Sequence, residues 1–357
     1  MKDDYLWDGS GEPDAEVQKL ENLLGRYRQD QPAPASVVEQ AFDQLAAEKP
    51  VRHRWSFLLS RFSFQLAAAA AVLLIGVATF VVIRVRQTNN SGPAWEIARI
   101  EGAPRVGWHS LSANSETAKL KVGQTLVTDN SSRASITLDE TGQIEVDPAS
   151  RLRVIASGPD RKRLSLERGT IHATIWAPPG EFVVDTPSAV AVDLGCVYTL
   201  HVDDSGAGLL RTTMGWVGFK LNGHESFIPA GAVCATQPKI GPGTPYFEDA
   251  SPSFRNALSK FDFAKVTRQE HNALLGILLV DARPQDALTL WHLLSRVSDA
   301  DRPGVYDRLA VLAPPPKDVT REGILRLDLK MLDSWWNSLG YGDVYLWHTY
   351  ERTWSEK

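Results

Sequence analysis

The hydrophobic positions of the chain follow three patterns in turn. Residues 66–83 form a run of 18 positions without a charged side chain. Between residues 95 and 238, apolar and polar residues alternate over short stretches, as they do from Ala134 to Asp139. After residue 253 the apolar residues recur at intervals of three and four. These patterns predict a multidomain α+β protein with an uncharged span, a β-rich domain and a C-terminal helical region.

The uncharged run is long enough to cross a membrane. About 18 to 22 helical residues, at about 1.5 Å rise each, span roughly 27–33 Å, the thickness of a bilayer's hydrocarbon core. We therefore expect one transmembrane helix over residues 62–84, with its uncharged part running from Leu66 to Ile83. A buried core helix is the alternative, although such helices rarely lack a polar face over this length. A cleaved signal peptide is not expected, because the run begins far from residue 1.

Basic residues flank this run unevenly. Four lie before it and two after it: Lys49, Arg52, Arg54 and Arg61, then Arg84 and Arg86. Because positive charge is retained on the cytoplasmic side, this favours a cytoplasmic N-terminus. The expected location is the inner (cytoplasmic) membrane, crossed once, with the C-terminal part on the periplasmic or extracytoplasmic side.

The segment of residues 1–61 is expected to be acidic, cytoplasmic and helical. Residues 1–48 carry a formal charge of −7, and the pair Ser36 and Glu39 has the spacing of a capping box. Two short amphipathic helices bury too little to be stable alone, so we expect them to dock on a basic partner. An acidic, partly disordered tail is the alternative. The apolar positions expected to contact the partner are Val17, Leu20, Leu24, Tyr27, Phe42 and Leu45.

The alternating region, residues 95–238, is predicted to be an all-β domain of many short strands. Turn residues interrupt it at intervals of roughly 8–12 residues, which is typical of a sandwich or a barrel. The Asn222-Gly223 pair is the strongest hairpin signal, because both residues tolerate positive φ. We also expect turns at Gly142, Gly158 and Gly169. A short solenoid is the third architecture compatible with the pattern, although no strict repeat is present.

Four stretches of this region occur in an order that is informative. They are LKVGQTLVTDNSSRASITLDETGQIEVDPASRLRV, LSLERGTIHATI, FVVDTPSAVAVDLGCVYTLHVDD and GWVGFKLNGHESFIPAGAVC. In order and spacing, the run from Gly102 to Pro238 resembles the FecR domain of transmembrane anti-sigma regulators. The chain has Gly195-Cys196-Val197-Tyr198 where that family commonly has G-T-x-F.

The resemblance implies a membrane-anchored, signal-transducing regulator of transcription. By this resemblance the protein is a FecR-type anti-sigma factor that relays an envelope signal to a cytoplasmic sigma factor. Its partners would be a sigma factor or another basic cytoplasmic protein, membrane lipid, and an unidentified envelope protein or ligand on the outer side. The alternative is a structural or adhesive envelope protein that binds a glycan or a protein partner through its outer domain.

The C-terminal third is expected to be a linker, residues 239–252, followed by a helical region, residues 253–357. Prolines and glycines dominate the start of the linker. Pairs of helices with short loops suggest a small bundle. The aromatic residues at its end, from Trp335 to Trp354, are expected to pack against the bundle, with a partner or sugar surface as the alternative.

The chain has two cysteines, Cys196 and Cys234, for which two states are open. They would form a disulfide in an oxidising compartment, or remain two buried thiols. With His201 and His224 they show no spacing typical of a metal site, so we expect none. We find no G-x-S-x-G, P-loop or G-x-G-x-x-G motif and expect no enzyme activity, catalytic residues or cofactor. The net charge of −5 gives no reason to expect nucleic-acid binding.

Overall fold

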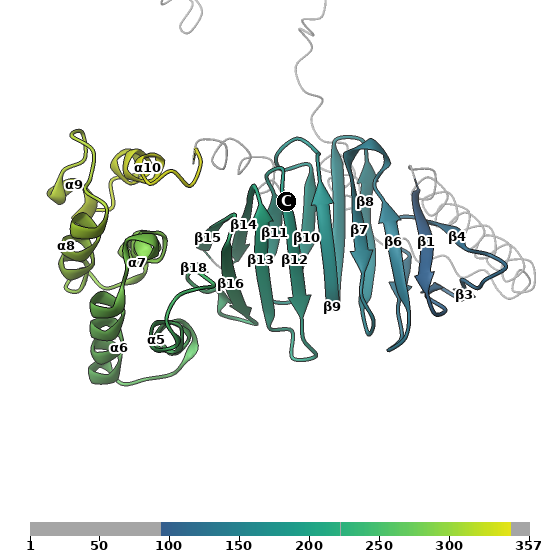
Figure 1. Cartoon of the computed structure of the whole chain (residues 1–357), viewed down its shortest axis with the longest axis horizontal. Coiled ribbons are helices and arrows are strands. Elements are labelled where there is room, and N and C mark those ends of the chain that lie inside the picture. Colours follow the sequence, from purple (N-terminus) through teal and green to yellow (C-terminus); the bar gives the residue numbers. More distant parts are fainter. Residues whose placement is uncertain (1–93, 222, 344–357) are drawn as a thin grey trace, which may run out of the picture. The chain divides into compact units, whose positions relative to one another are not determined.

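The computed structural model of the chain describes residues 94–221 and 223–343, which belong to one compact unit. In this part, eighteen strands precede the helices (Figure 1). The first nine strands are β1 Trp95–Glu101, β2 Arg105–Val106, β3 His109–Ser110, β4 Thr117–Leu120, β5 Thr125–Val127, β6 Arg133–Thr137, β7 Gly142–Val146, β8 Arg151–Gly158 and β9 Arg161–Ile175. The others are β10 Phe182–Asp185, β11 Val190–Asp193, β12 Val197–Val202, β13 Gly208–Met214, β14 Trp216–Leu221, β15 His224–Pro229, β16 Ala232–Gln237, β17 Gly241–Pro242 and β18 Tyr246–Phe247.

The strands form two sheets that share β9. One sheet has the order β4-β1-β6-β7-β9-β12-β13-β16. The other has the order β3-β2-β5-β8-β9-β10-β11-β14-β15. The pairing of β9 with β10 is parallel, whereas the other pairings just cited are antiparallel. The hairpins β6–β7 and β12–β13 belong to the first sheet, and β10–β11 and β14–β15 belong to the second, so neighbouring stretches of sequence build both walls of one domain.

One hydrophobic core lies between these sheets. Ile136 and Ile144 point into it from the first sheet, and Leu152 and Leu164 from the second, all at most 1% exposed. Burying each such side chain contributes about 1.5–3 kcal/mol. The alternation predicted for residues 134–139 is present in β6, whose burial alternates residue by residue. Of the three architectures expected, the two-sheet sandwich is the one that the strand pairing shows.

Gly169 allows β9 to serve both sheets. Residues up to Arg168 pair with β8, and residues from Gly169 pair with β12. Gly169 has φ of +96°, and a Cβ on it would lie 2.1 Å from Ser150 Oγ. No other residue fits there without moving this neighbour. The turn predicted at this glycine is therefore a bend within a 15-residue strand and does not reverse the chain.

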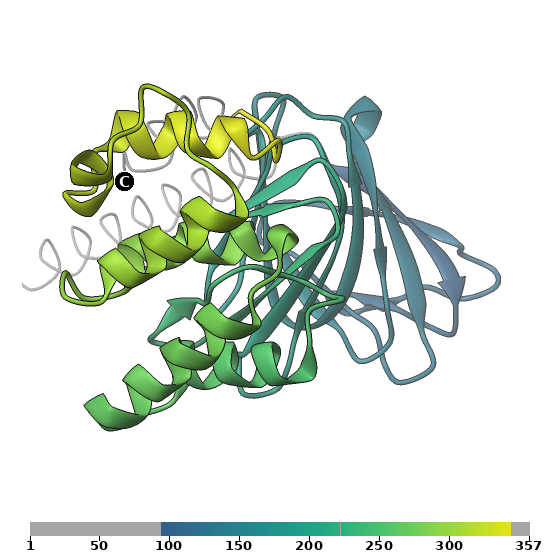
Figure 2. The ribbon, with the colours of Figure 1, turned by 60° about the vertical axis from the view of Figure 1, so that its left-hand side comes forward.

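The helical region follows β18 and has a core of its own. Its helices are α5 Pro252–Phe263, α6 Arg268–Asp281, α7 Ala287–Arg296, α8 Arg302–Leu312, α9 Arg321–Leu325 and α10 Leu329–Ser338. A short 3-10 turn, η3 Pro284–Asp286, precedes α7, and another, η2 Asp139–Thr141, lies in the β domain. Ser251 caps α5, and Thr267 with Glu270 forms a capping box at α6. The stretch expected to be a linker holds β17 and β18, both paired with β16. Figure 2 shows the helices gathered beside one end of the sheets.

The predicted fold class is corrected in one respect, the transmembrane helix. Among the helices of the described residues, none is long and apolar enough to cross a membrane. The longest, α6, has 14 residues and therefore a rise of about 21 Å, against roughly 30 Å of hydrocarbon. The segment assigned to that helix, residues 62–84 with Leu66 and Ile83, lies outside the described part. The fold class supported here is a β-rich domain followed by a helical region.

Candidate functional site

The seam between the β-rich domain and the helical region is built by helix α7. His292 and Arg296 lie one helical turn apart on α7, so both side chains face the same strand, β15. His292 Nε2 accepts a hydrogen bond of 3.0 Å from the backbone N–H of Phe227. Arg296 Nη2 donates to Glu225 O at 2.6 Å and to Ser226 Oγ at 2.8 Å. The helix thereby offers the outer strand an acceptor and a donor, as a further strand would.

The hydrogen bonds of His292 fix its protonation state. Since an amide N–H can only donate, Nε2 must accept, and Nδ1 then carries the proton toward Leu288 O at 2.9 Å. The side chain is 3% exposed. Burial, and then the charge of Arg296, lowers the pKa of His292 to about 3. The imidazole is therefore neutral and acts as a structural acceptor at neutral pH.

Aromatic rings fill the seam around Trp336, which is fully buried. Its ring centroid lies 5.2 Å from Phe227 of β15 and 4.8 Å from Trp291 of α7, both edge-on. The neighbouring Trp335 turns into the helical core instead, where its Nε1 donates to Ala313 O. Consecutive residues of α10 thus serve two cores, and this ties the two regions together. The aromatic packing expected for this part of the chain is seen at Trp335, Trp336 and Tyr341, although partly against the β domain.

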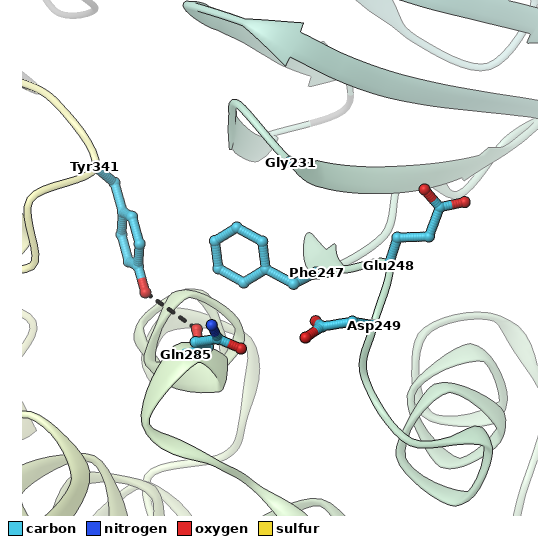
Figure 3. A pocket seen from close by; sticks show the side chains of 6 residues that line it. All are labelled: Gly231, Phe247, Glu248, Asp249, Gln285 and Tyr341. Carbon is cyan, nitrogen blue, oxygen red and sulfur yellow. Dashed lines mark hydrogen bonds between the residues drawn. The ribbon is translucent and has the colours of Figure 1, made fainter.

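A pocket of about 450 Å³ opens beside this seam (Figure 3). It lies where β18, the β15–β16 turn, η3 and the end of the helical region meet. Its lining residues are Gly231, Phe247, Glu248, Asp249, Gln285 and Tyr341. Nothing in the sequence patterns distinguished these six residues, because they come from four separate stretches of the chain. The one available signal was the aromatic content of the C-terminal part.

A second buried polar pair lies within the β domain. Asp193, at the end of β11, accepts a hydrogen bond from the Gly195 N–H at 2.7 Å and one from the Cys196 thiol at 2.5 Å. The residue is 2% exposed, and burial raises the pKa of Asp193 to about 7. Burial, together with the Asp193 carboxylate, also raises the pKa of the Cys196 thiol. That thiol is therefore protonated and a poor nucleophile.

The two cysteines are free thiols in the structure, and both are buried. Cys234 donates to Gly243 O at 3.2 Å, and burial raises its pKa to about 12. Of the two states left open by the sequence, the structure therefore has the buried thiols. The described residues contain no cluster of three or more His, Cys, Asp or Glu side chains that could hold a metal ion.

The predicted partner-binding residues cannot be placed relative to this site. Val17, Leu20, Leu24, Tyr27, Phe42 and Leu45 lie outside the described residues, as does residue 222 of the predicted hairpin turn. Gly223, the other residue of that turn, has φ of +78° and connects β14 to β15 as expected.

Comparisons with known proteins identify part of the β domain. The family model described as FecR protein matches residues 124–214, which run from β5 to the end of β13. Two crystal structures of a candidate anti-sigma factor from Parabacteroides distasonis, at 1.65 and 2.50 Å resolution, are each 14% identical with a TM-score of 0.31. Each alignment covers 38% of this chain and 64% of that protein. No curated protein matches the chain. The family match lies within the run from Gly102 to Pro238 that resembles a FecR domain in the sequence.

Proposed function

We propose that this protein is a regulator of the anti-sigma type, whose FecR domain lies outside the cytoplasm and whose acidic N-terminal segment holds a sigma factor. The observation that carries the proposal is the FecR match over residues 124–214. The match falls on strands of both sheets, so it covers the framework of the domain and not a peripheral loop.

The contacts of the seam support a role for the β domain and the helical region as a single unit that relays a signal. His292 and Arg296 bind the backbone of β15, and Trp336 belongs to the same core as the sandwich. A ligand or partner that binds the helical region would therefore act on the FecR domain through these contacts. Signal relay of this kind needs a stiff connection, and the buried hydrogen bonds and aromatic contacts of the seam support that role.

The proposed sigma-factor contact can be tested on the full chain. The protein would be captured from its own cells at low salt, and retained proteins identified by mass spectrometry. We expect an extracytoplasmic-function sigma factor to be retained, and to be lost when Leu20→Asp is combined with Leu24→Asp. The matched control combines Gln18→Asp with Asn22→Asp, which adds the same charge off the apolar stripe. Retention of no sigma factor, or equal loss in both double variants, would overturn the proposal.

Membrane location is a separate proposal, which rests on the uncharged residues 66–83. We expect the full-length protein in the inner-membrane fraction, with the FecR domain digested by protease added to the periplasmic side. Recovery of the protein in the soluble fraction would refute the location while leaving the sigma-factor contact to be judged by its own test.

A further inference from the structure

The pocket of Figure 3 has the volume of a small-molecule site and is widely open to solvent. Its volume of about 450 Å³ falls within the range of roughly 300–1,000 Å³ typical of ligand pockets. Figure 3 shows Gln285 next to the Tyr341 hydroxyl, Phe247 beside Tyr341, and Glu248 and Asp249 on the far side of Phe247. Neither the family match nor the anti-sigma proposal assigns this pocket a role, because it lies beyond residues 124–214.

The aromatic side is held in place before any ligand arrives. Phe247 belongs to β18 and pairs with Ala232 of β16. Its ring centroid lies 5.8 Å from that of Tyr341, with the planes tilted by 51°. The Tyr341 hydroxyl donates to Gln285 O at 3.0 Å, and its own carbonyl accepts from Trp216 Nε1. A fixed aromatic wall needs no ordering on binding, which favours affinity.

The polar side consists of carboxylates that are already paired with arginines. Asp249 accepts from Arg283 Nη1 and Nη2 at 3.1 and 3.0 Å, and the Arg283 hydrogen bonds lower its pKa. Glu248 accepts from Arg211. Each ionised carboxylate has about four acceptor positions, so both retain capacity for hydroxyl donors. Arg211 pairs with Glu248, whereas Arg283 is shared between Asp249 and the buried Asp286, so the charge of the carboxylates is only partly compensated.

This combination points to a neutral, hydroxyl-rich ligand with one apolar face. We propose that the pocket binds a pyranose sugar, with its C–H face on Phe247 and Tyr341 and its hydroxyls toward Glu248 and Asp249 at one end and Gln285 at the other. An anionic ligand would meet the two carboxylates, and a cationic one would have to compete with the arginines that already pair with them. A sugar ring satisfies both sides, because its hydroxyls donate and accept while its C–H face is apolar.

The test uses the purified full-length protein and isothermal titration calorimetry. The probes are trimers of N-acetylglucosamine, of β-linked glucose and of α-linked glucose, with arginine amide as a cationic probe. We expect saturable binding of at least one trimer. Phe247→Leu, which keeps an apolar side chain but removes the ring, and Glu248→Gln should each weaken it about tenfold or more.

The matched control is Glu167→Gln, which removes a comparable arginine pair, with Arg151, outside the pocket. It should leave sugar affinity unchanged, and thermal melting should show that all three variants are folded. The proposal is overturned if no trimer binds, if arginine amide binds the pocket in place of the sugars, or if Glu167→Gln weakens binding as much as Glu248→Gln.

Discussion

The sandwich and the seam each bury a titratable side chain, but they treat it in opposite ways. In the sandwich, Asp193 is a buried acid bound by near neighbours, Gly195 and Cys196. In the seam, His292 is a buried base bound to Phe227, 65 positions away in the sequence. Burial raises the pKa of the acid and lowers that of the base, so both are pushed toward neutrality. Stability therefore depends on pH in opposite directions in the two regions.

The largest expected effect comes from removing the aromatic centre of the seam. Trp336→Ala should lower the free energy of unfolding by about 3–5 kcal/mol, because a fully buried ring is lost and a cavity remains. Denaturant unfolding followed by circular dichroism measures this. The control is Trp176→Ala, since Trp176 is 69% exposed and its loss should cost less than about 0.5 kcal/mol. Equal effects in both variants would contradict the assignment of Trp336 as the centre of the seam.

The seam should lose stability on acidification. The unfolded chain binds a proton at His292 below about pH 6.5, whereas the folded protein does so only below about pH 3. The stabilising contribution of His292 is therefore fully present above about pH 6.5. It is lost as the pH falls, by about 3 kcal/mol between pH 6.5 and 4. His292→Gln keeps an acceptor but does not titrate, so its unfolding free energy should decline less over this range. A variant as acid-sensitive as the wild type would show that His292 is protonated in the fold.

The sandwich should respond in the opposite sense. Between about pH 4 and pH 7 the folded protein keeps a proton on Asp193 that the unfolded chain has released. Raising the pH from 5 to 7 should therefore lower the contribution of Asp193 by about 2–3 kcal/mol. Asp193→Asn removes this term, so its stability relative to the wild type should increase across that range. A constant difference between the two proteins from pH 5 to 8 would mean that Asp193 is ionised when buried.

The comparison also explains which features could be predicted from the sequence. The strands of the sandwich could be predicted because apolar and polar residues alternate along them, as the burial does from Arg133 to Thr137. Helix α7 was recognisable from its apolar spacing. Helix α5 begins at Pro252, one residue before the helical region predicted from residue 253, and Ser251 before Pro252 is its helix-start signal.

The seam and its pocket could not be predicted from the sequence, for a physical reason. A periodic pattern reports which face of an element is buried, but not which distant element covers it. His292 lies in an apolar helical stretch and carries no sign that its acceptor serves Phe227. Trp335 and Trp336 are adjacent, yet they enter different cores. The Asp193–Cys196 pair, although only three positions apart, was missed because a buried carboxylate has no pattern in a strand.

The smallest expected effect comes from replacing one arginine in the seam, which can be compared with a matched arginine in the sandwich. Arg296 donates to Glu225 O and Ser226 Oγ, and also to Pro242 O at 3.2 Å. Arg296→Lys keeps the charge, but a single ammonium on a flexible stem cannot reach all three acceptors in this geometry. We expect a loss of about 1 kcal/mol and faster amide hydrogen exchange along β15.

The matched variant in the sandwich is Arg163→Lys. Arg163 makes a two-bond pair with Asp185, at 2.7 Å each, across β9 and β10. Its replacement should cost a similar free energy, yet it should leave exchange along β15 unchanged, because the strands around Asp185 do not depend on α7. If exchange along β15 instead rises equally in both variants, or in neither, then the Arg296 contacts do not specifically protect β15. In that case the contacts of His292 and Arg296 would not stabilise β15. The stiff connection between the two regions would then have to come from the aromatic rings around Trp336.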